Sequence, residues 1–165
     1  LYGVSYVNNT FEAVGQSGTI LTSSDGISWT SRTSGHTSKE VTYGNSKFIS
    51  VGDNGAIYTS TDGTTWTSRT SGTSQTLWGI TFGNSTFVAV GDSGTILTSS
   101  DGITWTSRTS GTSNLLEGAT YGNSTFLVVG WGATILTSSD GTTWTSRTSG
   151  TSLNSSVELT SVSFR

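Results

Sequence analysis

The side chains that could do chemistry are few in this chain. It has 165 residues, of which ten are acidic, seven are basic and one is His, and it has no Cys. The absence of Cys excludes a thiolate nucleophile, a thiolate metal site and a disulfide framework. His36 could serve a Ser nucleophile or bind a metal, but it stands in a loop of Ser, Gly and Thr without a second His in the chain. We therefore expect no catalytic or metal centre at His36.

Carboxylate and guanidinium groups also form no recognisable catalytic set. General acid–base work would require two carboxylates to meet, and the Glu residues occupy non-equivalent positions: Glu12, Glu40, Glu117 and Glu158. Four Arg residues stand at one repeated position: Arg32, Arg69, Arg108 and Arg147. We interpret them as solvated charges on a rim, where they discourage sheet pairing. The sequence predicts no enzymatic activity and no cofactor.

These residues are carried by four copies of one unit. One motif occurs four times in the chain. It reads Ser or Thr, then Asp-Gly, one variable residue, Ser or Thr, and finally Trp-Thr-Ser-Arg-Thr-Ser-Gly. The Asp residues of successive copies are 37, 39 and 39 residues apart. The Asp residues are Asp25, Asp62, Asp101 and Asp140. We place the repeats at residues 1–38, 39–75, 76–114 and 115–152. A fifth copy starts at residues 153–165, because residues 159–164 match residues 1–6.

Each unit contains four short β-rich segments. In the third copy we expect strands at residues 78–82, 87–91, 95–98 and 104–109, with turns at residues 83–86 and 92–94. Asp101-Gly102 is expected to form a two-residue hairpin turn between the last two strands, because both positions tolerate positive φ. No segment has the spacing of an amphipathic helix.

Four antiparallel strands in about 39 residues match the size of one β-propeller blade. One such sheet cannot bury both of its faces alone, whereas blades around a common axis can. We predict a single all-β propeller domain, with Trp29 and its equivalents filling the gaps between blades. A β-solenoid is an alternative, although its repeats are usually shorter. A disordered Ser/Thr-rich stalk is opposed by the lack of Pro and the regular spacing of the 17 aromatic residues.

The turn before the fourth strand resembles the Asp-box, or BNR, repeat, whose pattern is Ser-x-Asp-x-Gly-x-Thr-Trp. The third copy reads Ser99-Ser100-Asp101-Gly102-Ile103-Thr104-Trp105, which is one residue shorter between Asp and Gly. The family includes sialidases, secreted glycosidases, some lectins and photosystem assembly factors. In that family the Asp-box is a folding element away from the active site. The resemblance therefore implies a propeller in which each Asp accepts hydrogen bonds from backbone N–H groups of its own turn.

Comparison of the copies separates constant turns from variable positions. The variable residues at the start of the first strand are Tyr2, Lys39, Trp78 and Glu117, and those after the second strand are Gln16, Asp53, Asp92 and Trp131. Because function on repeat scaffolds tends to reside in such positions, we predict a ligand-binding face. Trp78 and Trp131 would be stacking platforms for a carbohydrate, and the acidic residues would accept hydrogen bonds. Drift at tolerant positions is the alternative.

The composition of the chain and the number of its repeats limit which partners we expect. A net charge of −3 makes nucleic acid a poor partner, and no apolar run approaches the roughly 18 residues of a membrane span. The chain begins with Leu, so we expect a processed product or a piece of something longer. Four blades and one extra strand do not close neatly, so we expect further copies of the chain, or the rest of a longer one, to complete the ring.

We predict a non-enzymatic, secreted or cell-surface module that acts as a scaffold or adhesive, with glycans or another protein as partner. A lectin with one weak site per blade is the second hypothesis. A fragment of a glycosidase is the third.

Overall fold

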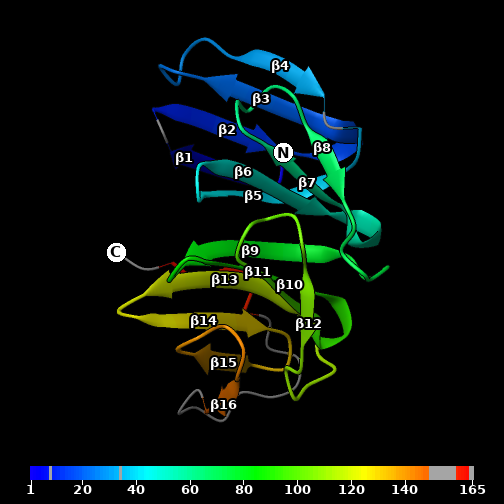
Figure 1. Ribbon diagram of the computed structural model, residues 1–165, viewed down its shortest axis with the longest axis vertical. Helices are drawn as coiled ribbons and strands as arrows, with labels where there is room; N and C mark the ends of the chain where they lie inside the picture. The colour runs from blue at the N-terminus through cyan, green and yellow to red at the C-terminus, as the bar shows by residue number, and fades with distance from the viewer. Residues whose placement is uncertain (8, 34, 149–158, 164–165) are drawn as a thin grey trace.

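The computed structural model describes residues 1–7, 9–33, 35–148 and 159–163. Within them the backbone forms four antiparallel sheets of four strands each (Figure 1). Three short 3-10 turns are present, and none of the described residues lies in an α-helix. The sheets follow one another in chain order, one sheet per repeat. The prediction of an all-β propeller is confirmed.

Each sheet is named here as a blade. Blade 1 contains β1 (Gly3–Val7), β2 (Thr10–Val14), β3 (Thr19–Ser23) and β4 (Thr30–Thr33). Blade 2 contains β5 (Ser38–Gly44), β6 (Lys47–Gly52), β7 (Ile57–Ser60) and β8 (Thr67–Arg69). Blade 3 contains β9 (Leu77–Gly83), β10 (Thr86–Gly91), β11 (Ile96–Ser99) and β12 (Thr106–Arg108). Blade 4 contains β13 (Leu116–Gly122), β14 (Thr125–Gly130), β15 (Thr134–Ser138) and β16 (Thr145–Arg147).

The two-residue hairpin of blade 3 lies between its first and second strands. Gly83 pairs with Thr86, and the intervening Asn84 and Ser85 have φ values of 44° and 57°. Positive φ at both central residues is the signature of a type I′ turn, whose twist matches that of the flanking strands. The prediction of a two-residue hairpin at Asp101-Gly102 is wrong, because the nearest strand pair there is Thr98 with Thr106.

Side-chain hydrogen bonds explain this wider loop. Asp101 Oδ1 accepts hydrogen bonds from the N–H groups of Ile103 (2.8 Å) and Thr104 (2.9 Å). Ser99 Oγ donates to the same oxygen and accepts from the N–H of Gly102 (2.8 Å). The bonds from the Thr104 and Ile103 N–H groups lower the pKa of Asp101 to about 2. The loops around Asp25, Asp62 and Asp140 repeat the backbone bonds to the carboxylate.

The hydrophobic core lies between the blades. At the interface of blades 2 and 3, buried side chains of both blades form one cluster: Ile49, Val51 and Ile57 from blade 2, and Leu77, Ile80, Phe87, Ala89 and Leu97 from blade 3. Trp105 packs against this cluster, while Trp144 and Trp66 pack against the corresponding clusters on either side. Trp29 of blade 1 is different, because it is 40% exposed. The apolar residues of each repeat therefore bury the faces of neighbouring sheets.

The first strand of each blade lies beside the first strand of the next, in the order β1, β5, β9, β13. Close approach here requires glycine at the end of the strand. A Cβ at Gly83 would lie 2.0 Å from the Tyr121 ring of the next blade. Residues 159–163 continue the series, since the backbone of Ser161 and Val162 borders Gly118 of β13.

No strand is assigned within residues 159–163, and the rest of the predicted fifth copy lies outside the described residues. The N–H of Leu159 donates to the carbonyl of Gly130 (3.4 Å), as the N–H of Ser38 does to Gly15 (3.0 Å). Residues 159–163 thus occupy the position of a following first strand. No helix among the described residues has the length and hydrophobicity needed to cross a membrane.

Candidate functional site

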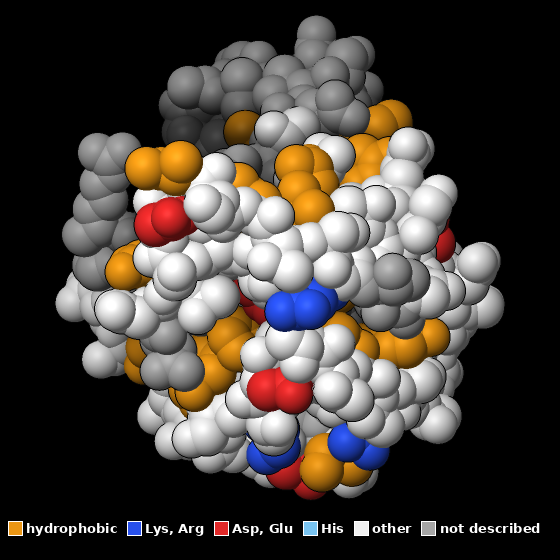
Figure 2. All heavy atoms as spheres, turned by 90° about the horizontal axis from the view of Figure 1, so that it is seen from above, with side chains coloured by type: hydrophobic (Ala, Val, Ile, Leu, Met, Phe, Trp, Pro, Cys, Tyr) orange, Lys and Arg blue, Asp and Glu red, His pale blue; other side chains and the backbone are white. Residues whose placement is uncertain are grey.

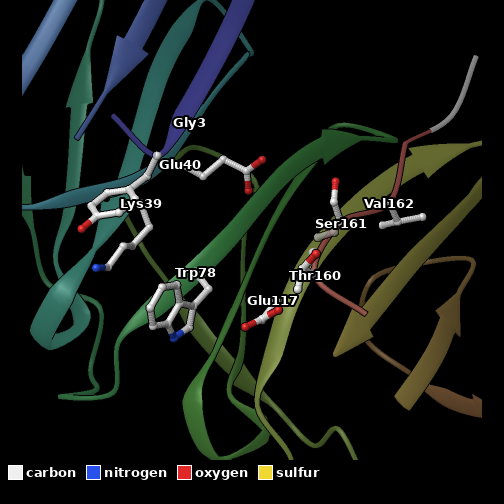
Figure 3. A pocket seen from close by; sticks show the side chains of 11 residues that line it. Gly3, Lys39, Glu40, Trp78, Glu117, Thr160, Ser161 and Val162 are labelled. Carbon is white, nitrogen blue, oxygen red and sulfur yellow. The ribbon is translucent and has the colours of Figure 1, made fainter. Parts of the chain in front are cut away.

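A cavity of about 330 Å³ opens between the first strands of the blades. We call it the inner pocket. Its walls come from all four blades and from the segment after them: Tyr2, Gly3, Lys39, Glu40, Trp78, Glu117, Gly118, Ala119, Thr160, Ser161 and Val162. Figure 3 shows the Lys39 side chain beside the Trp78 ring, with Glu40 and Glu117 extending from β5 and β13. Inner strands thus bring together residues that are far apart in the sequence.

Lys39 provides a cation at one side of the inner pocket. Its Nζ lies 4.6 Å from the centroids of both the Tyr2 and the Trp78 rings, within the range of a cation–π contact. The same Nζ lies 3.1 Å from Asp53 Oδ1, which follows the second strand of the same blade. The ammonium group is therefore held in place by two rings and neutralised by one carboxylate.

Trp78 is anchored in the same manner within blade 3. Its indole N–H donates to Asp92 Oδ1 at 2.8 Å, and Asp92 also follows the second strand of its own blade. In blades 2 and 3, the variable residue that opens the first strand is thus bound by the variable residue after the second strand. Asp53 and Asp92 act as partners of pocket residues and do not line the pocket themselves.

Glu40 is the pocket residue that sequence reasoning missed. The other three full copies have glycine at its position, namely Gly3, Gly79 and Gly118. Glu40 Oε2 accepts a hydrogen bond of 2.7 Å from the Ile80 N–H of the neighbouring blade. Burial raises the pKa of Glu40 to about 7, although this hydrogen bond opposes the rise. The replacement of a repeated glycine by an ionisable residue was the signal that could have identified it.

The structure gathers half of the predicted ligand-binding residues. Tyr2, Lys39, Trp78 and Glu117 line the inner pocket. Trp131 and Gln16 are exposed and are not part of its wall, so Trp78 and Trp131 are not brought together as two platforms in one cavity.

Glu40 and Glu117 do line one cavity, contrary to the interpretation that the Glu residues lack a common site. The two residues belong to β5 and β13, on either side of β9, and irregular pairing at Ser38/Glu40 and Leu116/Gly118 interrupts the usual alternation of side chains at the start of both strands.

His36 and the repeated Arg residues lie elsewhere. The His36 ring stacks on Tyr58 with 4.0 Å between centroids, and its Nε2 is 3.2 Å from Ser38 Oγ. Ser38 is fully buried, so this hydroxyl is not presented to a substrate. The Arg residues occupy the outermost strands, where Arg69, Arg108 and Arg147 each donate from Nε to a Thr hydroxyl of the adjacent strand. Within the described residues, no group of three or more His, Asp or Glu side chains could hold a metal ion.

Comparison with known proteins identifies the fold. No protein-family model matches the chain, and no curated protein matches it. The structure is similar to that of YCF48 from Cyanidioschyzon merolae, with a TM-score of 0.71, 19% identity, and coverage of 93% of this chain and 57% of that chain. A structure described as YCF48 bound to D1 peptide gives a TM-score of 0.68 and 21% identity, covering 88% of this chain and 51% of that chain.

An exo-1,5-alpha-L-arabinanase from a bovine ruminal metagenomic library gives a TM-score of 0.45 with 14% identity, over 82% of this chain and 67% of that chain. The present chain thus spans slightly more than half the length of the two YCF48 chains. At these identities the likeness to YCF48 shows the β-propeller fold alone.

Proposed function

We propose that this protein is a non-enzymatic interaction module that binds a partner protein at the inner pocket. The observation that carries the proposal is the wall of this pocket, which combines two aromatic rings with the carboxyl groups of Glu40 and Glu117. Aromatic faces and carboxylates together suit a long basic side chain, whose stem packs on a ring while its charged end meets an acid. We therefore assign the pocket to a Lys or Arg side chain of the partner.

The charge distribution favours a cation over an anion. Lys39 already forms an ion pair with Asp53, so its charge is compensated within blade 2. Glu40 has a hydrogen bond from a backbone N–H group and is not paired with a cation by any contact of the described structure. An entering ammonium or guanidinium group would supply that missing charge.

A protein partner is also supported by the fold relative described as bound to a peptide. Carbohydrate binding is less well supported, because the indole N–H of Trp78 is already bonded to Asp92 and does not donate to a sugar hydroxyl.

Hydrolysis is the competing interpretation of Glu40 and Glu117, since glycosidases use two carboxyl groups in one cavity and one of these groups has a raised pKa. Glu40 does not need this explanation. Its pKa is raised by burial, and its oxygen is fixed by the Ile80 N–H, which is consistent with a binding group.

Titration calorimetry with the capped peptide Gly-Gly-Arg-Gly-Gly tests the proposal, with Gly-Gly-Glu-Gly-Gly as the matched control. The Arg peptide should bind, and its affinity should rise between pH 6 and pH 8, because Glu40 loses its proton near pH 7. Glu40→Gln should weaken binding about tenfold at pH 8 and remove the pH dependence, since a charge-assisted hydrogen bond contributes about 1.5 kcal/mol or more.

Glu40→Gly, which restores the residue of the other copies, should behave like Glu40→Gln. Equal binding of the Glu peptide, no binding of the Arg peptide, or release of nitrophenol from aryl glycosides by the unaltered chain but not by Glu40→Gln would each overturn the proposal.

A further inference from the structure

Blade 1 has an apolar face that the other blades bury. Leu1 is 71% exposed and Val4 is 70% exposed. Most of their repeat equivalents are buried: Ser38, Leu77 and Leu116 are fully inaccessible, and Val41 and Ile80 are 4% and 3% exposed, while Ala119 is half-buried. The same sequence positions therefore form an interface in blades 2 to 4 and a bare surface in blade 1.

This surface is hollowed and has almost no charge. A second cavity, of about 440 Å³, is lined by Leu1, Tyr2, Val4, Ala13, Leu21 and Trp29. Figure 2 shows the end of the molecule at which blade 1 lies, where hydrophobic side chains reach a surface that is otherwise mostly uncharged. An apolar hollow of this kind on a small domain is typical of an interaction site.

The internal interfaces show what fits such a face. Blade 3 is covered by the residues Ile49, Val51 and Ile57 of blade 2, which come from the second and third strands. The equivalent residues of blade 4 are Leu127, Val129 and Ile135, and of these Leu127 and Ile135 are only partly buried. The chain thus carries both halves of one more interface, on its first and its last blade.

We propose that the fourth blade of a second copy covers the first-blade face, in a head-to-tail contact that repeats the internal interface. The contact does not depend on the proposed peptide binding. It would also cover part of the Tyr2 side chain, which lines both cavities and is 51% exposed. Such heterologous contacts build rings when the rotation closes.

Residues 159–163 compete with this contact. They lie where the first strand of a following blade would lie, and Leu159 and Val162 match Leu1 and Val4 in the repeat. The β1 strand of the second copy would take this position in exchange. Association is therefore expected to be weaker than the internal interfaces, which have no competitor.

Sedimentation velocity of the full chain from 1 to 200 µM, without peptide, tests the proposal. The chain should associate as its concentration rises, and Val4→Glu should raise the dissociation constant at least tenfold. Because Val4 is largely exposed, this change should leave the thermal unfolding of the isolated chain unaltered. Ile103→Glu is the matched control, since Ile103 is 43% exposed but belongs to a loop of blade 3.

A mixture of two variants establishes the direction of the contact. Ile135→Glu alters the fourth-blade face, and each of the two variants alone should associate at least tenfold more weakly than the unaltered chain. Mixed together they should form a heterodimer, because one intact face of each kind remains. A monomer at every concentration, association of Val4→Glu equal to that of the unaltered chain, or no heterodimer in the mixture would each overturn the proposal.

Discussion

Glu12 is a buried carboxyl group at the interface of blades 1 and 2. The side chain is fully inaccessible, and neither of its carboxylate oxygens has a hydrogen-bond partner. A Cβ on Gly63 of blade 2 would lie 2.6 Å from Oε1. The other copies carry Ile49, Val88 and Leu127 at the position of Glu12. Desolvation raises the pKa of Glu12 to about 8, so the folded chain holds this group protonated at neutral pH.

Glu12→Leu should therefore stabilise the protein. The carboxyl has a pKa of 4.5 before burial and about 8 in the folded chain, so its unfavourable contribution grows as the pH rises from 4.5 to 8. We expect the free energy of unfolding of the variant to exceed that of the unaltered chain by about 4 kcal/mol at pH 8 and by less at pH 5. Urea denaturation at both pH values measures the difference.

Glu12→Gln serves as the control, because it keeps the size and polarity of the side chain and removes only its titration. If either variant showed the same change in free energy of unfolding with pH as the unaltered chain, this change would not come from Glu12. A weaker dependence of the free energy of unfolding on pH should persist up to about pH 7 in both variants, because the pKa of Glu40 is raised as well.

Glu12 and Glu40 are residues whose surroundings could not be predicted from the sequence. The variable positions that open the first strands were recognised, and the structure does bring Tyr2, Lys39 and Trp78 to one pocket. The pairing of Lys39 with Asp53 and of Trp78 with Asp92 depends on distances across one blade, which the spacing of the residues in the sequence does not reveal. The two Glu residues could have been noticed as breaks in the repeat pattern, but their burial depends on how neighbouring blades pack.

At the scale of single elements, the hairpins between first and second strands hold Ser residues in left-handed backbone. The φ values of Ser46, Ser85 and Ser124 are 58°, 57° and 57°. An L-residue pays a steric cost there that glycine does not, because its Cβ approaches the following carbonyl. The usual preference for this turn is Asn-Gly.

Ser85→Gly is expected to raise the free energy of unfolding by about 0.5 to 1 kcal/mol. The triple variant at residues 46, 85 and 124 should raise it by about three times as much, because the three turns belong to different blades. Thermal and urea unfolding provide the measurement. Ser100→Gly is the control, since Ser100 is not among the residues with positive φ, and a comparable gain from it would argue against backbone strain as the cause.

The Asp-Gly loops show why a turn dipeptide alone does not predict the length of a hairpin loop. Asp-Gly is a strong hairpin signal when only backbone conformation matters. Here Ser99 and Asp101 satisfy the backbone N–H groups of the loop with their side chains, so the chain does not need to close in two residues. The strands themselves were predicted to within a few residues, because alternation and β-branched side chains are local properties.

At the scale of the whole molecule, the blades differ in how many of their faces are covered. Blades 2 and 3 each contribute to two interfaces, whereas blade 1 contributes to one and exposes its other face. In repeat proteins, stability is approximately a sum of terms for the units and for the interfaces between neighbours. An end unit therefore opens more readily than an inner one.

Hydrogen exchange should reveal this gradient. At 1 µM, where self-association is least, we expect amides of β10 and β11 to exchange at least tenfold more slowly than those of β2 and β3. Mass spectrometry of peptic fragments resolves the two blades. Equal protection in all four blades would mean that the molecule opens only as one unit, against the expectation from its interfaces.

The ion pair of Lys39 with Asp53 and the hydrogen bond of Trp78 to Asp92 each close within a single repeat. A segment of about 39 residues therefore contains a pocket side chain together with the group that orients it. If a whole repeat were exchanged, by recombination or by design, the pocket side chain and its partner within the repeat would move together. The contacts of Lys39 with the Tyr2 and Trp78 rings come from the neighbouring repeats, so only the ion pair and the hydrogen bond would be kept in a new order of repeats.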